Sequence, residues 1–352
     1  MAQTQEHSVW RLKELGKGPT ALKLHREPVP VPGPGQYLVR IHSVSLNYRD
    51  IAYANGTYAG ANLETDLVLC ADMAGEIVYG GENTSKFQPG DRVTSLLDQA
   101  YLYGTASSGR ERQLPVILGG PLDGCLQQYR VFSEITLLRS PDYLTYDELS
   151  TFPIAAVTAW NALYGLKSLV PGQTVLLQGT GGTSIFGLLI AKAAGARTII
   201  TSSSDAKLEL ATKLGATHTV NYKRIPDWPE EVQKLTNGAG AHHIIDTVGI
   251  NEIEKCLGCV APGGIITSIG VLGGEPKANP NIPLLTIFKQ AILRGIIVGS
   301  KQQFEELLQF AEFNQIHPHI DRVFAFEQAV EALQYLESAQ HFGKIVIRVT
   351  PQ

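Results

Sequence analysis

The chain has 352 residues, of which 44% are hydrophobic, and a formal net charge of −4 at pH 7. That length is enough for two packed domains, and the slight acidic excess argues against a nucleic-acid-binding surface. Residues 1–6 contain neither a basic nor an apolar leader segment, and no apolar run approaches the roughly 20 residues that span a bilayer. We therefore expect a cytoplasmic protein.

The cysteines are too few and too scattered for the disulfide framework of a secreted protein, so we expect reduced thiols. They are Cys70, Cys125, Cys256 and Cys259. The last two form a C-x-x-C sequence, which could bind a metal or act in redox chemistry. Because no second such pair is present and the setting is helical, we favour two thiols packed in a core.

The first part of the chain has the pattern of a small β-barrel. Residues 8–46 alternate apolar and polar side chains over short runs and contain a proline and glycine cluster between 28 and 35. Residues 47–50 open a helical turn, and a Pro-Gly-Asp turn at 89–91 feeds a strand. Residues 98–112 show no periodicity. We expect a surface loop there that, with the segment up to 122, shapes the substrate pocket.

From residue 171 onward, apolar strand patterns alternate with helical ones, which indicates a parallel sheet wound on both faces. We expect a helix at 155–166 and strands at 174–178, 197–201, 217–221, 243–247, 264–269 and 292–298. A helix at 326–338 and a strand at 344–349 close the chain. The expected fold class is α/β, with a Rossmann domain at 152–314 and a β-barrel domain built from 1–151 and 315–352.

The turn after the first of these parallel strands carries the strongest binding signal. The strand ends at Gln178 and is followed by Gly-Thr-Gly-Gly at 179–182 and then by a helical pattern. Glycines let the backbone approach a ligand closely, and the free N–H groups of a helix start favour anions. The pattern predicts a diphosphate-binding turn, although an ordinary turn between a strand and a helix also tolerates glycine.

Five short motifs are spread along essentially the whole chain: G-D-R-V at 90–93, T-A-W at 158–160, G-T-G-G at 179–182, D-T-V-G at 246–249 and H-F-G-K at 341–344. In this order they resemble the motifs of the medium-chain dehydrogenase/reductase superfamily. The resemblance is strongest to the zinc-independent, quinone-oxidoreductase-like branch and to zinc-type alcohol dehydrogenase-like members. It implies a GroES-like catalytic domain, a Rossmann domain, a nicotinamide cofactor between them and commonly a homodimer.

The zinc ligands of metal-dependent members of this superfamily are missing here. Asn47 stands where they carry a cysteine, Ala71 where they carry a histidine, and the 98–112 loop where they carry a lobe with four cysteines. Asp72 takes the place of a glutamate, but one carboxylate cannot hold zinc, which takes about four ligands. The histidine pairs at 242–243 and 317–319 lack partners at ligand spacing. We therefore expect no bound metal.

The second parallel strand ends in three serines at 202–204 rather than in an acidic residue. An acid there holds both ribose hydroxyls of NAD and repels a 2′-phosphate, so the serines favour NADPH. Lys207 and Tyr222 match positions that contact this phosphate in NADPH-using relatives. The serines could instead cap a helix, Lys207 could be solvated and Tyr222 a half-buried aromatic, and Asp205 leaves an acid close by.

The full set of residues assigned to the cofactor follows from the glycine turn, the serines and the resemblance. It comprises Thr158, Gly179, Gly181, Gly182, Thr183, Ser184, Ser202, Ser203, Ser204, Lys207, Tyr222, Val248, Gly270, Val271, Val298, Gly299, Ser300 and Lys344. Residues 291–300 are also apolar enough for a strand at the edge of the sheet, and an unpaired edge of this kind predicts a homodimer.

Without zinc, hydride addition needs another way to stabilise the developing negative charge, and an enal, enone or quinone spreads that charge itself. Tyr58 matches the tyrosine that some enoyl reductases of this superfamily place near the substrate, so the resemblance makes it the leading candidate acid, with Tyr48 next. Asn47 could bind the ribose or a substrate oxygen. Tyr58 could equally be a surface aromatic, and Asn47 a residue that forms a turn. The sequence thus favours an NADPH-dependent C=C or quinone reductase. A metal-free alcohol dehydrogenase or carbonyl reductase, and an NADPH-binding protein without turnover, are the alternatives.

Overall fold

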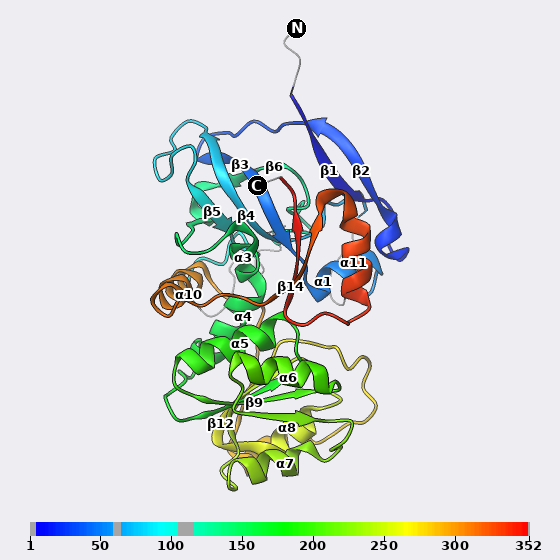
Figure 1. Ribbon diagram of the computed structural model, residues 1–352, viewed down its shortest axis with the longest axis vertical. Coiled ribbons are helices and arrows are strands. Elements are labelled where there is room, and N and C mark those ends of the chain that lie inside the picture. Colours follow the sequence, from blue (N-terminus) through cyan, green and yellow to red (C-terminus); the bar gives the residue numbers. More distant parts are fainter. Residues whose placement is uncertain (1–4, 59–64, 105–115, 351–352) are drawn as a thin grey trace. The chain divides into compact units, whose positions relative to one another are not determined.

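The computed structural model describes residues 5–58, 65–104 and 116–350 (Figure 1). The chain divides into two compact units, which we call the first unit (Met1–Ala155 with Ser300–Gln352) and the second unit (Ala156–Gly299). No helix in the described part of the chain is both long and apolar enough to cross a membrane. The sequence features at 1–4 and at 105–112 lie outside the described residues.

The second unit is an alternating series of strands and helices, as the sequence pattern predicts. Its helices are α4 (Val157–Tyr164), α5 (Gly182–Ala193), α6 (Asp205–Leu214), α7 (Trp228–Leu235), α8 (Ile253–Cys259) and α9 (Ile282–Lys289). Its strands are β8 (Thr174–Gln178), β9 (Arg197–Ser202), β10 (His218–Asn221), β11 (Ala241–Asp246), β12 (Val260–Ser268) and β13 (Ile292–Gly295).

Among the described residues these strands form a six-stranded sheet in the order β10-β9-β8-β11-β12-β13, and every pairing is parallel. The chain moves outward from β8 to β10, then returns to β11 and moves outward the other way. Since such crossovers are right-handed, the two halves place their helices on opposite faces. Figure 1 shows α5 and α6 on one side and α7 and α8 on the other. This confirms the expected Rossmann fold.

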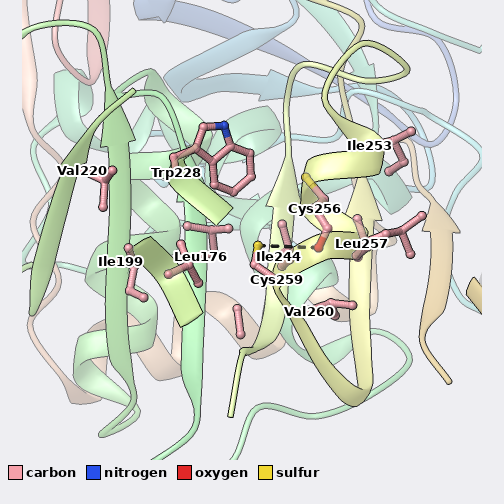
Figure 2. Close-up of a cluster of buried hydrophobic side chains, with 13 residues drawn as sticks. Leu176, Ile199, Val220, Trp228, Ile244, Ile253, Cys256, Leu257, Cys259 and Val260 are labelled. Atoms are coloured by element: carbon pink, nitrogen blue, oxygen red, sulfur yellow. Dashed lines mark hydrogen bonds between the residues drawn. The ribbon is translucent and has the colours of Figure 1, made fainter. Parts of the chain in front are cut away.

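Both faces of the central strands are covered, so the middle residues of these strands are buried and mostly apolar. All five residues of β8 are buried. Figure 2 shows the core on the α7 and α8 side, where Leu176, Ile244 and Trp228 pack with Cys256 and Cys259. Both thiols are fully buried and free, and burial raises their pKa values. The C-x-x-C is therefore a core-packing pair, as we favoured from the sequence.

The first unit contains the remaining elements. Its strands are β1 (Glu6–Leu12), β2 (Leu22–Pro28), β3 (Gln36–Ser45), β4 (Asp72–Gly80), β5 (Arg92–Ser95), β6 (Tyr129–Ser133), β7 (Leu137–Arg139), β14 (Ile320–Ala325) and β15 (Lys344–Arg348). Its α-helices are α1 (Tyr48–Ala54), α3 (Tyr146–Leu149), α10 (Lys301–Phe313) and α11 (Ala329–Glu337). Short 3-10 turns lie at Gly18–Ala21, Glu134–Thr136 and Phe326–Gln328.

Strand β3 organises the first unit. It pairs along much of its length with β4, its first half pairs with β6, and its last residues pair with β15 from the C-terminal part of the chain. In the described residues the main sheet has the order β14-β15-β3-β4-β5-β7, while β1 and β2 form a separate hairpin. The expected GroES-like domain is thus built from both ends of the chain.

Two boundaries differ from those expected from the sequence. Residues 300–314 fall in the first unit, because the backbone N–H groups of Lys301 and Gln302 donate to the carbonyls of Tyr101 and Leu102. The edge strand β13 ends at Gly295 rather than near 298, where Val298 has a φ of 54° that no strand can continue. A π-helix at Phe152–Ala156 also precedes α4 inside the segment expected as one helix.

Strand β13 is the last strand of its sheet, and no strand of the described chain pairs with its outer edge. The neighbouring helix α9 has no buried residue, and it exposes 69% of Ile287 and 74% of Phe288. An apolar sheet edge beside an apolar helix face is a surface that association would cover. We propose that a second copy of the chain covers it.

Light scattering should therefore give about twice the mass of a single chain at micromolar concentration. Leu293→Glu, which places a charge on β13, should give monomers. Val323→Glu is the matched control, because Val323 is equally exposed on β14, the edge strand of the other sheet. A monomeric native protein, or equal dissociation by both variants, would contradict the proposed surface.

Candidate functional site

Strands β8 and β11 are adjacent, but the chain leaves their carboxyl ends in opposite directions, which is where open α/β sheets bind ligands. After β8, Gly179 turns with a φ of 74°. A Cβ added to Gly179 or Gly181 would meet no atom within 4 Å, so the space over the turn is open. Helix α5 then begins at Gly182 without a side-chain cap. Its first N–H groups can therefore bind an anionic diphosphate.

Buried polar side chains fix the loop that follows β11. Asp246 is fully buried, and its Oδ1 accepts hydrogen bonds from the backbone N–H groups of Val248 (3.0 Å) and Gly249 (2.9 Å). Its Oδ2 accepts from the Ser268 hydroxyl at 2.9 Å. In the sequence, Asp246 stands out only as part of the D-T-V-G motif. A lone acid directly after Ile244 and Ile245 is the signal that could identify it as the residue that holds this loop.

Gln178 links the two strand ends and was not predicted either. Its Oε1 accepts from the backbone N–H of Thr247 at 3.1 Å, and its carbonyl accepts from the Ser184 hydroxyl at 2.7 Å. Ser184 is 1% exposed, so its side chain holds the glycine turn from below. A Cβ on Gly270 would lie 2.3 Å from the carbonyl oxygen of Thr247, which explains that glycine by packing.

The other second-unit candidates differ in exposure. Thr158 is buried on α4, Thr183 and Val248 are half-buried, and Val271 is exposed. The carbonyl of Val298 accepts from the Asn161 side chain at 2.6 Å, which fixes the backbone before Gly299.

Ser300 belongs to the first unit. It is 1% exposed and accepts from the N–H of Gln303, so its side chain caps α10.

The three serines after β9 act in part as caps. The hydroxyl oxygen of Ser202 accepts from the N–H of Ser204 at 3.2 Å, and that of Ser204, the N-cap of α6, accepts from the N–H of Lys207 at 3.4 Å. Each hydroxyl keeps its own hydrogen for donation. The backbone N–H of Tyr222 donates to the carbonyl of Ser202 at 3.1 Å. The structure thus brings the serines, Lys207 and Tyr222 to one strand end.

In the first unit, Asn47, Asp72 and Lys344 form one buried polar group. Lys344 donates from Nζ to the carbonyl of Leu46 (2.7 Å), Asn47 Oδ1 (2.8 Å) and Asp72 Oδ2 (3.3 Å). The same carboxylate oxygen accepts from Asn47 Nδ2 at 2.8 Å and from the Ser45 hydroxyl at 2.9 Å. These contacts fix the orientation of the Asn47 amide, with its oxygen toward Lys344 and its nitrogen toward Asp72.

The strands explain this meeting of distant residues. Ser45 at the end of β3 lies opposite Asp72 at the start of β4, and Lys344 starts β15 on the other side of β3. Asp72 and Lys344 are almost completely buried. Burial is the larger influence on both: it raises the pKa of Asp72 and lowers that of Lys344, while their mutual attraction opposes both shifts.

Asp50, one turn into α1, is a second buried carboxyl next to this group. Its Oδ2 accepts from the backbone N–H of Asn47 at 2.8 Å. Burial raises the pKa of Asp50 to about 6, against the attraction of Arg49. Asn47 is therefore held at its backbone by Asp50 and at its side chain by Asp72 and Lys344.

Tyr58 lies beside buried partners, whereas Tyr48 is 53% exposed. The Tyr58 ring stacks on Tyr53 with centroids 4.9 Å apart, and the guanidinium of Arg49 lies 5.7 Å from its centroid. A guanidinium over an aromatic face is attracted to the ring and helps to hold it in place. Tyr58 is therefore better positioned than the exposed Tyr48.

The residues at the zinc position of metal-dependent dehydrogenases do not fit the metal. The amide of Asn47 is bonded on both sides, Ala71 has no donor, and the carboxylate of Asp72 is paired with the ammonium of Lys344. Among the described residues, no three His, Cys, Asp or Glu side chains lie close enough together to hold a metal ion. Zinc needs at least three such ligands.

Comparisons with known proteins agree with the fold. Residues 33–142 match the family model of the alcohol dehydrogenase GroES-like domain, and residues 182–312 match that of the zinc-binding dehydrogenases. A GroES-like unit joined to a Rossmann-like sheet defines an oxidoreductase of the dehydrogenase class.

The relatives narrow the class. The zinc-type alcohol dehydrogenase-like protein C1773.06c of Schizosaccharomyces pombe is 41% identical over 321 residues, which cover 90% of this chain and 91% of that protein. The quinone oxidoreductase of Pseudomonas aeruginosa is 28% identical, over 94% of this chain and 96% of that protein. A solved NAD-dependent alcohol dehydrogenase matches with a TM-score of 0.87 at 32% identity, over 98% of this chain and 100% of that chain. The chain belongs to the medium-chain dehydrogenase/reductase superfamily.

The buried Asp72–Lys344 pair generates a stability prediction. Asp72→Asn and Lys344→Met should each lower the free energy of unfolding by about 3–5 kcal/mol, because each leaves its partner buried without a counter-charge. The double variant should lose less than the sum of the two. The exposed pair Lys13–Asp66 is the control, and Lys13→Met should change stability by less than about 1 kcal/mol. Urea unfolding measures all four, and additive losses would show that the two groups do not interact.

Proposed function

We propose that the protein is an NADPH-dependent, zinc-independent oxidoreductase of the cytoplasm that transfers a hydride to an activated C=C bond of an enal or enone, or to a quinone. The Asn47, Asp72 and Lys344 group carries the proposal about the reaction. It fills the position of the zinc ligands with residues that bind each other, so a substrate that delocalises its own negative charge fits this site best.

The end of β9 supports the choice of cofactor. Ser202 and Ser204 can donate from their hydroxyls, and Lys207 adds a positive charge one turn into α6. Donors and a cation suit a 2′-phosphate, whereas an acidic residue at this place would suit the free hydroxyls of NAD. The relatives differ in cofactor, since one of them is named an NAD-dependent alcohol dehydrogenase. The proposal of NADPH therefore rests on the serines and Lys207 of this chain rather than on its relatives.

A bound NADPH would supply the hydride, which adds to the β-carbon of the substrate and leaves an enolate. The protein's own residues then donate a proton to the enolate. We assign the proton to the Tyr58 hydroxyl, whose ring is held by Tyr53 and Arg49, and we assign Asn47 to orient the nicotinamide ribose or the substrate oxygen.

A substrate and cofactor screen tests the proposed function. Enones and quinones should be reduced with NADPH at rates well above those of saturated aldehydes, and elemental analysis should find no stoichiometric zinc. Two relatives carry alcohol dehydrogenase in their names, which favours the alternative of a metal-free alcohol dehydrogenase or carbonyl reductase. Turnover of alcohols or saturated aldehydes alone would establish that alternative, and binding of NADPH without any turnover would indicate a non-catalytic protein.

Tyr58→Phe should lower kcat by at least about tenfold with little change in NADPH affinity, because a positioned general acid contributes typically 10²- to 10⁴-fold. Tyr79→Phe, a tyrosine on β4 that is 42% exposed, is the control and should keep full activity. If Tyr58→Phe keeps most of its kcat, solvent water supplies the proton instead.

A further inference from the structure

Asp205 is the one feature of the cofactor region that opposes the proposed preference for NADPH. It is the first residue of α6 and follows directly after the serines of β9. Its side chain is 44% exposed. A carboxylate this close to an adenosine ribose would repel a 2′-phosphate, which carries about −1.5 to −2 charges at pH 7. Something must offset this charge if NADPH is preferred.

The turn after β10 supplies partners to both oxygens of this carboxylate. Asn221 Nδ2 donates to Asp205 Oδ1 at 2.8 Å. The guanidinium of Arg224 forms an ion pair with Asp205 Oδ2 through Nη2. Asp205 is therefore held by Asn221 at the end of β10 and by Arg224 in the turn that follows, whereas in the sequence it stands only as an acid close to the serines.

Backbone hydrogen bonds fix the turn that presents Arg224. The carbonyl of Asn221 accepts from the N–H groups of Arg224 (3.1 Å) and Ile225 (2.9 Å). Asn221 Oδ1 accepts from the N–H of Lys223 at 3.0 Å. Asn221 itself is 9% exposed, and the next residue, Tyr222, is bonded to the strand end of β9. The side chain of Arg224 thus starts from a defined position beside the serines.

Arg224 has donors left after pairing with Asp205. A guanidinium carries five N–H donors, and the described contacts of the Arg224 side chain with protein groups use only Nη2. The side chain is 72% exposed, so the remaining donors face solvent. A phosphate monoester can accept two parallel bonds from such a group. An exposed ion pair contributes little to stability, so folding alone does not require this one.

We propose that Arg224 determines the cofactor preference of this protein: it neutralises Asp205 and offers its free donors to the 2′-phosphate of a dinucleotide. This inference rests on the proposed NADPH dependence and extends it to a residue and an ion pair that the sequence analysis did not select. With Arg224 in place, the carboxylate of Asp205 is paired with a cation, and Lys207 adds a positive charge in the first turn of α6. Without Arg224, the carboxylate of Asp205 loses its cation.

Binding of the adenosine half of the cofactor tests this directly and needs no turnover. The probes are 2′,5′-ADP, which carries the 2′-phosphate, and 5′-AMP, which lacks it, each measured by calorimetry. Wild-type protein should bind 2′,5′-ADP at least about tenfold more tightly than 5′-AMP. Arg224→Ala should weaken 2′,5′-ADP by at least about tenfold and change 5′-AMP by less than about twofold.

The double variant separates neutralisation from a purely direct contact. Asp205→Asn keeps an oxygen that can accept from Asn221 but removes the charge. Added to Arg224→Ala, it should recover at least about threefold of the lost 2′,5′-ADP affinity, because no carboxylate then opposes the phosphate. Lys223→Ala is the control from the same exposed turn and should change both affinities by less than about twofold. Circular dichroism should show that all variants fold alike.

The results distinguish a wrong cofactor preference from a wrong role for Arg224. If the wild type binds both probes equally, the NADPH preference in the proposed function is wrong. If the wild type prefers 2′,5′-ADP but Arg224→Ala leaves the ratio unchanged, or the double variant recovers nothing, the inference about Arg224 and Asp205 is wrong while the proposed function stands. Higher salt should weaken 2′,5′-ADP binding to the wild type far more than to Arg224→Ala.

Discussion

The second unit depends on one constraint, which is that β8 and β11 lie side by side while the chain leaves them toward opposite faces of the sheet. No helix can cover the carboxyl ends of both strands at once, so a space with free backbone groups remains there. Gln178 and Asp246 stand at the ends of the two strands, and their hydrogen bonds hold the glycine turn and the loop after β11. The glycines at 179–182 and Val248, which we assigned to the cofactor, belong to the turn and the loop that these bonds hold.

Much of the fold could be predicted from the sequence because its signals are local. A buried parallel strand such as β8 has an apolar centre, Val175–Leu177, and the glycines that follow it indicate the turn. The boundaries that differ from the prediction are those where tertiary contacts decide. Lys301 and Gln302 follow an apolar run, and only their hydrogen bonds to distant parts of the first unit show that α10 belongs there.

The candidate sites show the same limit more strongly. Lys344 was assigned to the cofactor by motif, but it is buried and bonded to Asn47 and Asp72, which are hundreds of residues away in the chain. Arg224 and Asp205 look like two ordinary surface charges in the sequence, and only the packing of β10 beside β9 brings them together. Side-chain pairing between strands carries no periodic signal, so a single sequence does not reveal it.

The pairing of β15 with β3 has a consequence for the order in which the chain can fold. Synthesis proceeds from the N-terminus, so Val44 and Ser45 of β3 emerge long before Val346 and Ile347, the residues they pair with. Until then this end of β3 has an open edge, and Asp72 lacks the ammonium that it faces in the finished protein. All strands of the second unit's sheet lie between residues 174 and 295, so this sheet can form before the C-terminal part of the chain is synthesised. A ribosome-bound chain would therefore carry a finished Rossmann sheet next to an incomplete barrel, and chaperones that recognise open strand edges would have their target in the N-terminal part of the chain.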